Sequence, residues 1–351
     1  HHHHHHHSPC DHSIDLMIHG FLVPVFAKKE IKKMMTVAAL YQFAEMDEDE
    51  AHRIVREMRD VMSKYDVRGN VRVAREGVNG TICGDRIGVE KFLDVVKGIK
   101  AKRRNELIYK EAMAKTHVYE KAIVKYKEEI VSIGPDAVKD ALPLKRIGTY
   151  VKPEDWNERV VDDPDTIILD VRNDYEIQMG TFKGAVNPKT DTFNDFTKFV
   201  RNVLTRKVSK DSKVAMFCTG GVRCEKASSL LLSEGYKDVY HLKGGILQYL
   251  QDVPKKDSTY QGECYVFDKR VSVDHDLKRG SYAQCAVCRK YVLEKSLQNN
   301  FCCKACLDSP KALELMEKKR KRDIDIGRWK KAQAKKKNKK AFSGGGVIPK
   351  N

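Results

Sequence analysis

The stretch that decides the fold is FCTGGVRCEKAS, residues 217–228. The apolar run KVAMF (residues 213–217) leads into it, and such solid runs are typical of parallel strands buried on both faces of a sheet. The residues after it have the apolar spacing of a helix, which stops at Gly235. A loop between such a strand and such a helix lies at the edge of an α/β sheet where ligands bind. The stretch therefore predicts that Cys218 belongs to a functional site.

The loop favours an ionised thiol. The small residues after Cys218 let several backbone N–H groups point inward as a nest for an anion. The N-terminal end of the following helix adds partial positive charge, and Arg223 adds a full charge. We therefore predict that Cys218 and Arg223 are the catalytic residues. The anion cradle is predicted to consist of Thr219, Gly220, Gly221 and Val222.

The spacing of the loop indicates which thiolate chemistry it suits. Tyrosine phosphatases use Cys-x5-Arg, a loop sized for a phosphate, whereas Cys218 and Arg223 form the tighter Cys-x4-Arg. The smaller cradle suits a persulfide, which adds one sulfur atom to the cysteine. Cys224 has two open interpretations. It is either a thiol that resolves a persulfide or sulfenate on Cys218 as a disulfide, or a small residue that caps the helix.

Residues 34–140 and 146–255 are predicted to form two different domains. The first has the order β-α-β-β-α-β, which indicates a ferredoxin-like sandwich. Its expected elements are a strand at TVAALYQF, a helix opened by Asp47 and Glu50, strands at 71–74 and 80–83, a helix at 89–99 and a strand within 121–134. The Asn-Gly of REGVNG is typical of a turn between the two short strands. The second domain repeats β-α units, as an α/β fold does.

A second stretch, LDVRNDYEIQMGTFKGAVN (residues 169–187), resembles a rhodanese domain when taken with the loop. The resemblance assigns supporting positions to Asp170, Arg172 and Glu176. In rhodaneses the loop cysteine carries a persulfide, a role that falls here on Cys218. Thr181 departs from the family pattern, which more usually has a histidine at this place.

Two further stretches narrow the resemblance to one subfamily. REGVNGTICG (residues 75–84) and GTYVKPEDWN (residues 148–157), with the two stretches above, resemble the rhodanese-containing tRNA uridine hydroxylases. That family places a ferredoxin-like or acylphosphatase-like domain before the rhodanese domain. The resemblance implies hydroxylation of the wobble uridine of tRNA at carbon 5, with molecular oxygen as co-substrate and tRNA as partner.

Two other functions also fit the residues. A rhodanese-type sulfurtransferase would carry a persulfide from a small sulfur donor to a thiol or to an RNA-modification partner, and it needs only the loop. A non-catalytic RNA-binding or scaffold protein would leave the loop without a function. No nicotinamide- or flavin-binding motif is seen. The histidines outside the N-terminal run are scattered, so no redox-metal site stands out.

Four cysteines near the C-terminus have the spacing of metal ligands. Cys285-x2-Cys288 and Cys303-x2-Cys306, with fourteen residues between the pairs, predict a structural zinc site. The site would stabilise a small module over residues 260–316. Cys302 competes with Cys303 as a ligand, and a set of free thiols is the alternative.

The positive charge is concentrated near the C-terminus. The net charge is +17, and residues 318–340 hold thirteen Lys or Arg against two Asp. Residues 317–351 are therefore predicted to be a disordered basic tail that contacts nucleic acid, with a merely solubilising tail as the alternative. Phosphate contacts would supply affinity but little sequence readout. Arg75 and Asn79 of REGVNG are candidate RNA contacts, unless that segment is only a tight hairpin.

The N-terminal region carries no fold signal. The seven leading histidines are typical of a purification tag, so residues 1–33 are taken as tag and extension. No apolar run reaches the roughly 18 residues of a membrane helix, and no membrane association is expected. Six of the ten cysteines follow residue 263, which favours ligands and functional thiols in a reducing compartment. The cytoplasm is the expected location, with an organelle as the alternative in a eukaryote.

Overall fold

A computed structural model describes residues 14–18, 21–25 and 34–345. The chain divides into two compact units, one up to Gly280 and one from Ser281. Near the start of the first unit, β1 (Ile14–Ile18) and β2 (Phe21–Val25) pair antiparallel. Both strands fall in the segment that the sequence assigned to tag and extension, and the other residues of that segment up to 33 lie outside the described residues.

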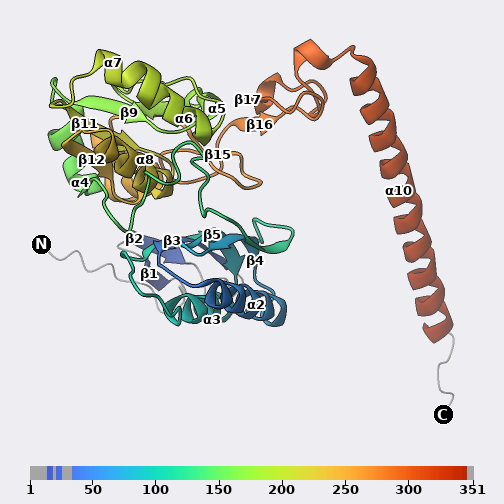
Figure 1. The fold of residues 1–351 in the computed structure, drawn as a ribbon. Helices are drawn as coiled ribbons and strands as arrows, with labels where there is room; N and C mark the ends of the chain where they lie inside the picture. The colour runs from blue at the N-terminus through green and yellow to red at the C-terminus, as the bar shows by residue number, and fades with distance from the viewer. Residues whose placement is uncertain (1–13, 19–20, 26–33, 346–351) are drawn as a thin grey trace, which may run out of the picture. The chain divides into compact units, whose positions relative to one another are not determined.

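The N-terminal domain is a five-stranded sheet with two helices on one face (Figure 1). Its elements are β3 (Met35–Phe43), α2 (Glu48–Lys64), β4 (Arg68–Ala74), β5 (Gly77–Gly84), α3 (Arg86–Lys97), β6 (Ile108–Ala114) and β7 (Ala122–Tyr126). The strand order is β6-β3-β5-β4-β7, with antiparallel pairs among the first four and β7 parallel to β4. This order confirms the ferredoxin-like sandwich, with one strand added at its edge.

The alternation of side chains along β3 divides them between the two faces of the sheet. Ala38 and Leu40 join the core that the sheet forms with α2 and α3. Val37, Ala39 and Tyr41 point to the opposite face, which the helices leave uncovered, and line a cavity. The uncovered face of the N-terminal sheet is therefore available to build a site.

Two local predictions in this domain were wrong. The fourth strand of the sandwich is β6, whereas the predicted strand within 121–134 is the added edge strand β7. The Asn79-Gly80 pair lies inside β5, because Ala74 pairs with Gly77 and leaves a two-residue turn before the Asn-Gly.

The second domain is a parallel α/β sandwich, as predicted. Its elements are β8 (Thr149–Val151), α4 (Pro153–Trp156), β9 (Ile167–Asp170), α5 (Asp174–Ile177), β10 (Gly180–Phe182), α6 (Phe193–Phe199), α7 (Thr205–Lys207), β11 (Lys213–Phe217), α8 (Val222–Ser233), β12 (Asp238–Leu242) and α9 (Gly245–Asp252). The sheet has the order β8-β12-β11-β9, and every pair is parallel. Helices α6 and α8 share a core with one face, and α4 and α9 share a core with the other. Apolar side chains on both faces explain why KVAMF is continuously hydrophobic.

The chain between 260 and 280 packs on the α/β domain. β13 (Tyr260–Gly262) pairs with β10, and β14 (Cys264–Tyr265) pairs with β15 (Ser272–Val273). Cys264 is buried in the same core as α4 and α9. This segment was predicted to belong to the cysteine-rich module of residues 260–316, whereas its packing places it in the first unit.

The second unit is a small cysteine-rich fold followed by a long helix. It contains β16 (Tyr282–Gln284), β17 (Tyr291–Leu293) and α10 (Pro310–Gly345). The first turn of α10 buries Ala312 against the cysteine-rich core, but nearly all side chains from 317 to 340 are exposed. Residues 317–345 of the segment predicted as a disordered tail are thus helical, because Lys, Arg and Ala favour helix. Residues 346–351 of that segment lie outside the described residues. Among the described helices, none is long and apolar enough to cross a membrane.

Candidate active site in the first unit

The reactive loop joins β11 to α8. Cys218 follows the last residue of the strand, and the amide of Gly221 donates a hydrogen bond to its Sγ at 3.1 Å. Gly221 has φ +101°, a left-handed conformation that turns this amide inward. The start of α9 supports the loop from below, because the amide of Ile246 donates to the Cys218 carbonyl at 2.9 Å. A side chain at Gly245 would place its Cβ 2.4 Å from the carbonyl oxygen of Thr219, so the two segments can touch only through glycine.

The pKa of the Cys218 thiol is lowered to about 6. Burial by itself would raise the pKa, because a thiolate loses hydration inside the protein. The hydrogen bond from the Cys224 thiol, the charge of Arg223 and the amides of Cys224 and Gly221 together outweigh burial. Cys218 is therefore mostly thiolate at neutral pH, as the sequence predicted, and the thiolate is the nucleophilic form.

Cys224 is the protonated partner of this thiolate. Burial raises its pKa well above the usual value, and the hydrogen bond to Cys218 and the charge of Cys218 raise it further. Cys224 is fully buried at the first turn of α8. In this arrangement its thiol donates a hydrogen bond to Cys218, a contribution that neither of the two interpretations of Cys224 included.

Glu176 fixes the position of Arg223. The guanidinium donates to both carboxylate oxygens of Glu176, at 2.7 and 2.8 Å, and to Thr219 Oγ1 at 3.3 Å. Burial would raise the pKa of Glu176, but the positive charge of Arg223 holds it below its usual value. The buried bidentate pair aims the cation at the loop.

The other two supporting residues stabilise the sheet edge. Asp170 and Arg172 form a fully buried pair, with hydrogen bonds of 3.0 and 2.8 Å. Thr181 stands where rhodaneses more usually have a histidine, and its Oγ1 donates a hydrogen bond to Asp170 at 2.7 Å. Arg172 also donates to the Gly180 carbonyl at 2.6 Å. None of Asp170, Arg172 and Glu176 reaches the cavity described next.

Cys218 lies in the wall of a cavity of about 440 Å³. The loop contributes Cys218, Thr219, Gly220, Val222 and Arg223. The uncovered face of the N-terminal sheet contributes residues that include Val37, Ala39, Tyr41, Asn79 and Lys110. The segment between 266 and 277 closes a third side. The cavity is therefore built jointly by the two domains, and the reactive loop is only one of its walls.

The two candidate RNA contacts in REGVNG lie in different places. Asn79 lines the cavity, and its side-chain amide donates to the Ile130 carbonyl at 3.0 Å. Arg75 is exposed at the β4–β5 turn and does not line the cavity.

Two functional candidates of the cavity were missed in the sequence. Lys110 lines it from β6, and its Nζ is buried with no hydrogen-bond partner among the described residues. Burial lowers the pKa of Lys110 to about 7. Tyr41 lines it from β3, and its hydroxyl donates to Glu225 of α8 at 2.8 Å. Tyr41 belongs to an ordinary apolar strand, and Lys110 belongs to a strand without apolar alternation, so only the placement of the second domain could have revealed them.

Helix α8, which follows the reactive loop, also forms buried ion pairs with the N-terminal domain. Lys226 is fully buried, and its Nζ contacts Glu76 at 2.8 Å and Glu129 at 2.6 Å. Glu76 belongs to the turn of REGVNG. Three consecutive residues of α8 thus make different contacts. Cys224 donates to the Cys218 thiolate, Glu225 accepts from the Tyr41 hydroxyl, and Lys226 pairs with the two glutamates of the N-terminal domain.

Comparison with known families identifies both domains. A family model described as "UPF0176 acylphosphatase like domain" matches residues 35–130, and one described as "Rhodanese-like domain" matches residues 153–252. The chain therefore joins an acylphosphatase-like domain to a rhodanese-like domain. That architecture is the one expected from the sequence motifs.

Solved rhodanese-like structures are similar to about a third of this chain. A rhodanese-like domain from Anabaena sp. is 19% identical, with 33% of this chain and 80% of that chain covered and a TM-score of 0.27. A rhodanese-related protein from Thermoplasma volcanium is 21% identical, with 30% and 95% covered and a TM-score of 0.24. A rhodanese-like domain protein from Staphylococcus aureus is 21% identical, with 29% and 90% covered and a TM-score of 0.24. TM-scores this low carry no argument for fold or function.

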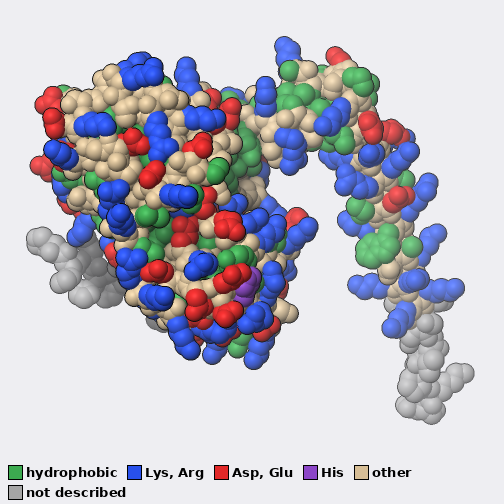
Figure 2. Space-filling model, in the orientation of Figure 1, with side chains coloured by type: hydrophobic (Ala, Val, Ile, Leu, Met, Phe, Trp, Pro, Cys, Tyr) green, Lys and Arg blue, Asp and Glu red, His purple; other side chains and the backbone are tan. Residues whose placement is uncertain are grey.

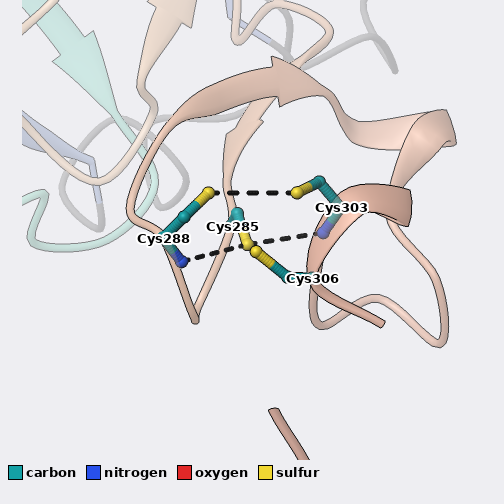
Figure 3. A group of neighbouring side chains, drawn as sticks. All are labelled: Cys285, Cys288, Cys303 and Cys306. Carbon is teal, nitrogen blue, oxygen red and sulfur yellow. Dashed lines mark hydrogen bonds between the residues drawn. The ribbon is translucent and has the colours of Figure 1, made fainter. Parts of the chain in front are cut away.

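The second unit contains a four-cysteine cluster that could hold a metal. The Sγ atoms of Cys285, Cys288, Cys303 and Cys306 all lie within 4.8 Å of one another (Figure 3). Those of Cys288 and Cys303 are 3.9 Å apart, close to the spacing of about 3.8 Å that four 2.3 Å metal–sulfur bonds give in a tetrahedron. The Cys285 sulfur also accepts amides of Cys288 and Cys303, as thiolate ligands do.

The competition between Cys302 and Cys303 is resolved by this geometry. Cys303 belongs to the cluster, whereas Cys302 is fully buried in the small core beside it.

Proposed function

We propose that this protein hydroxylates the wobble uridine of tRNA at carbon 5 in an oxygen-dependent reaction, with Cys218 as its catalytic thiol. One observation carries the proposal: the acidified thiol opens onto a cavity built by both domains. A persulfide carrier needs only the loop that holds the sulfur atom. A cavity with an entire second domain as a wall supports an organic substrate that meets the thiolate there.

The size and lining of the cavity support a nucleoside as this substrate. Its volume of about 440 Å³ falls in the range of about 300–1,000 Å³ of small-molecule sites. Enzymes that modify a base turn it out of its stack into such a pocket. Asn79, Lys110 and Tyr41 place amide, amine and hydroxyl groups on the sheet wall, and these can hydrogen-bond the polar edge of a uracil. Val37 and Ala39 supply apolar surface against the ring.

The second unit supports binding to the tRNA backbone. Figure 2 shows Lys and Arg side chains along the described length of α10. Thirteen such residues between 318 and 340, on an exposed helix, can contact phosphates without reading sequence. In this proposal α10 supplies affinity, and the cavity supplies the choice of base.

We further propose that the four-cysteine cluster binds structural zinc. All four ligands are thiolates, and none is left open for a substrate, as in closed zinc sites. The bound metal would supply folding energy to a unit whose apolar core is small. Free thiols at all nine described cysteines fit the cytoplasm or another reducing compartment.

Nucleoside mass spectrometry of bulk tRNA tests the proposed reaction. Cells that lack the gene would be complemented with the wild-type protein or with Cys218→Ala. We expect 5-hydroxyuridine, or a nucleoside derived from it, to return only with the wild type. Equal amounts in the deleted and both complemented strains would contradict the proposal.

The second candidate is a sulfurtransferase, and the loop itself favours it. Gly221 and Arg223 stabilise a negative sulfur at Cys218, and the same groups would stabilise a persulfide formed from a small sulfur donor. Steady formation of thiocyanate from thiosulfate and cyanide, lost in Cys218→Ala, would support it. It becomes the leading function if that activity is present while 5-hydroxyuridine is unaffected in the cells.

A further inference from the structure

A half-satisfied carboxylate lies behind the wall of the Cys218 cavity. Glu225 is 1% exposed, and its Oε1 accepts hydrogen bonds from Tyr41 at 2.8 Å and Tyr150 at 2.6 Å. Its Oε2 is buried with no hydrogen-bond partner in the described part of the chain. A buried carboxylate with one oxygen unsolvated is costly to keep ionised. Packing alone does not require a carboxyl group at this position, because the side chain of a glutamine would fill the same space.

Only one of the two tyrosines connects Glu225 to the cavity. Tyr41 lines the cavity together with Cys218, whereas Tyr150 does not line it. The hydroxyl of Tyr41 would lie 2.9 Å from a Cβ placed on Gly221, so it abuts the reactive loop. A ligand beside the thiolate can thus reach Glu225 through one hydroxyl group.

The groups around Glu225 leave its charge uncompensated. Lys226 is the next residue on α8, but its amine is paired with the two glutamates of the N-terminal domain. Beyond Tyr150 lie the buried ring of His241 and the amine of Lys243, which is paired with Glu106. On the loop side the negative charge of the Cys218 thiolate raises the pKa of Glu225 further.

The protonation state of Glu225 follows from these surroundings. Burial raises its pKa to about 7, the two tyrosine hydrogen bonds lower it, and the negative charges of Cys218 and Glu106 raise it. Because the folded-state pKa lies above the ordinary value, the protonated form is favoured and ionises only as the pH rises through about 7. A carboxyl group with such a pKa exchanges protons readily at neutral pH.

We propose that Glu225 and Tyr41 form a proton relay for the Cys218 cavity, with Tyr41 touching the ligand and Glu225 holding the proton. In the forward direction Glu225 starts in its ionised form, which is populated as the pH rises through about 7. A ligand N–H or C–H proton moves to the Tyr41 oxygen while the Tyr41 proton moves to Glu225 Oε1, and the electron pair of the broken bond stays on the ligand. The reverse step returns a proton to the ligand, and no electrons are transferred. The inference rests on the proposed function only for the ligand: uracil offers its N3 proton and the carbon-5 proton that hydroxylation replaces.

A matched set of variants separates a relay from a structural contact. Tyr41→Phe and Tyr150→Phe each delete one hydrogen bond to the same oxygen, but only the first removes a hydroxyl from the cavity. Glu225→Gln keeps the size of the side chain and cannot take up the proton. In complemented cells we expect Tyr41→Phe and Glu225→Gln to reduce 5-hydroxyuridine about 100-fold, the lower end for acid–base groups. Tyr150→Phe should lose far less, and equal losses in the two tyrosine variants would overturn the relay.

A second measurement does not depend on the reaction. The rate at which iodoacetamide alkylates Cys218 in the purified protein would be followed against pH by peptide mass spectrometry. The wild type should show an inflection near pH 7, besides that of the thiol, because ionised Glu225 is a negative charge near the sulfur. Glu225→Gln should lose this inflection, and its persistence would overturn the inference. An inflection without any 5-hydroxyuridine in cells would contradict the proposed function but leave the titrating carboxyl intact.

Discussion

The hydrogen bond from Cys224 to Cys218 gives the sharpest prediction about the reactive loop. The hydrogen bond from the Cys224 thiol makes the largest of the contributions that lower the pKa of Cys218. Cys224→Ala deletes the donor, whereas Cys224→Ser replaces the thiol with a hydroxyl that can donate in its place. Both variants remove the sulfur needed for a disulfide. The pair therefore separates a donor role from the resolving role.

The size of the effect follows from the energy of a charge-assisted hydrogen bond. Such bonds contribute about 1.5–3 kcal/mol, and one pKa unit corresponds to about 1.4 kcal/mol. Deleting the donor destabilises the thiolate, so the pKa of Cys218 in Cys224→Ala should rise by about 1–2 units from about 6. Cys224→Ser should stay within about half a unit of the wild type.

The assay is the pH dependence of Cys218 alkylation, with peptide mass spectrometry to distinguish it from other thiols. The midpoint is the correct readout, because a thiolate of higher pKa is also more nucleophilic. With a Brønsted coefficient of about 0.45, a rise of 1.5 units makes each thiolate roughly fivefold faster and hides most of the loss in its population. Coincident midpoints in the wild type and Cys224→Ala would show that the Cys224 thiol does not stabilise the Cys218 thiolate. Normal 5-hydroxyuridine in cells with Cys224→Ser would exclude a resolving role for Cys224.

Four further perturbations test the remaining parts of the structure. Lys226→Met breaks the buried contacts to Glu76 and Glu129 and should lower the free energy of unfolding by about 3 kcal/mol. This value is the lower end for breaking a buried ion pair, because the Glu76 side chain is still 23% exposed. A loss below about 1 kcal/mol in denaturant titrations would contradict the contribution of this ion pair to stability. Gly245→Ala should raise the midpoint pH of Cys218 alkylation, because the added Cβ would force the Thr219 carbonyl away. An unchanged midpoint would show that α9 does not position the loop. Purified protein should contain one equivalent of zinc after the tag is removed. A strong chelator should unfold the second unit, whereas the first unit should keep its melting transition. An equal zinc content after substitution of all four cluster cysteines would contradict the zinc site. Removing α10 should weaken tRNA binding and flatten its dependence on salt concentration, and an unchanged slope would assign the phosphate contacts to another surface.

The reactive loop was predictable because its signals are local. Cys218, the glycines and Arg223 lie within a few residues, and their effect on the thiol depends on a strand-to-helix turn that sequence patterns indicate well. The two supporting acids followed from the resemblance, although the structure shows that Glu176 orients Arg223 while Asp170 holds the sheet edge. The four-cysteine spacing was equally local.

The opposite wall of the cavity could not be predicted in the same way. Strand β6 has a single buried residue, Glu111, and half-buried residues elsewhere, so it lacks the apolar alternation of a strand with one solvated face. Lys110 was therefore not assigned to a strand. Glu225 was inside the quoted stretch, but an acidic residue in the first turn of a helix is ordinarily explained by the helix dipole. Its function emerges only when Tyr41, far away in the sequence, is placed against it.

The source of the oxygen atom added to uridine is the decisive test of an oxygen-dependent reaction at Cys218. The gene-deleted cells would be grown under oxygen gas labelled with a heavy isotope, with the wild-type protein or Cys218→Ala supplied, and the tRNA nucleosides would be weighed. The account predicts 5-hydroxyuridine that carries one labelled oxygen in the wild type and none of this nucleoside with Cys218→Ala. A 5-hydroxyuridine whose added oxygen is unlabelled, or one that forms equally with Cys218→Ala, would contradict an oxygen-dependent reaction at this thiol.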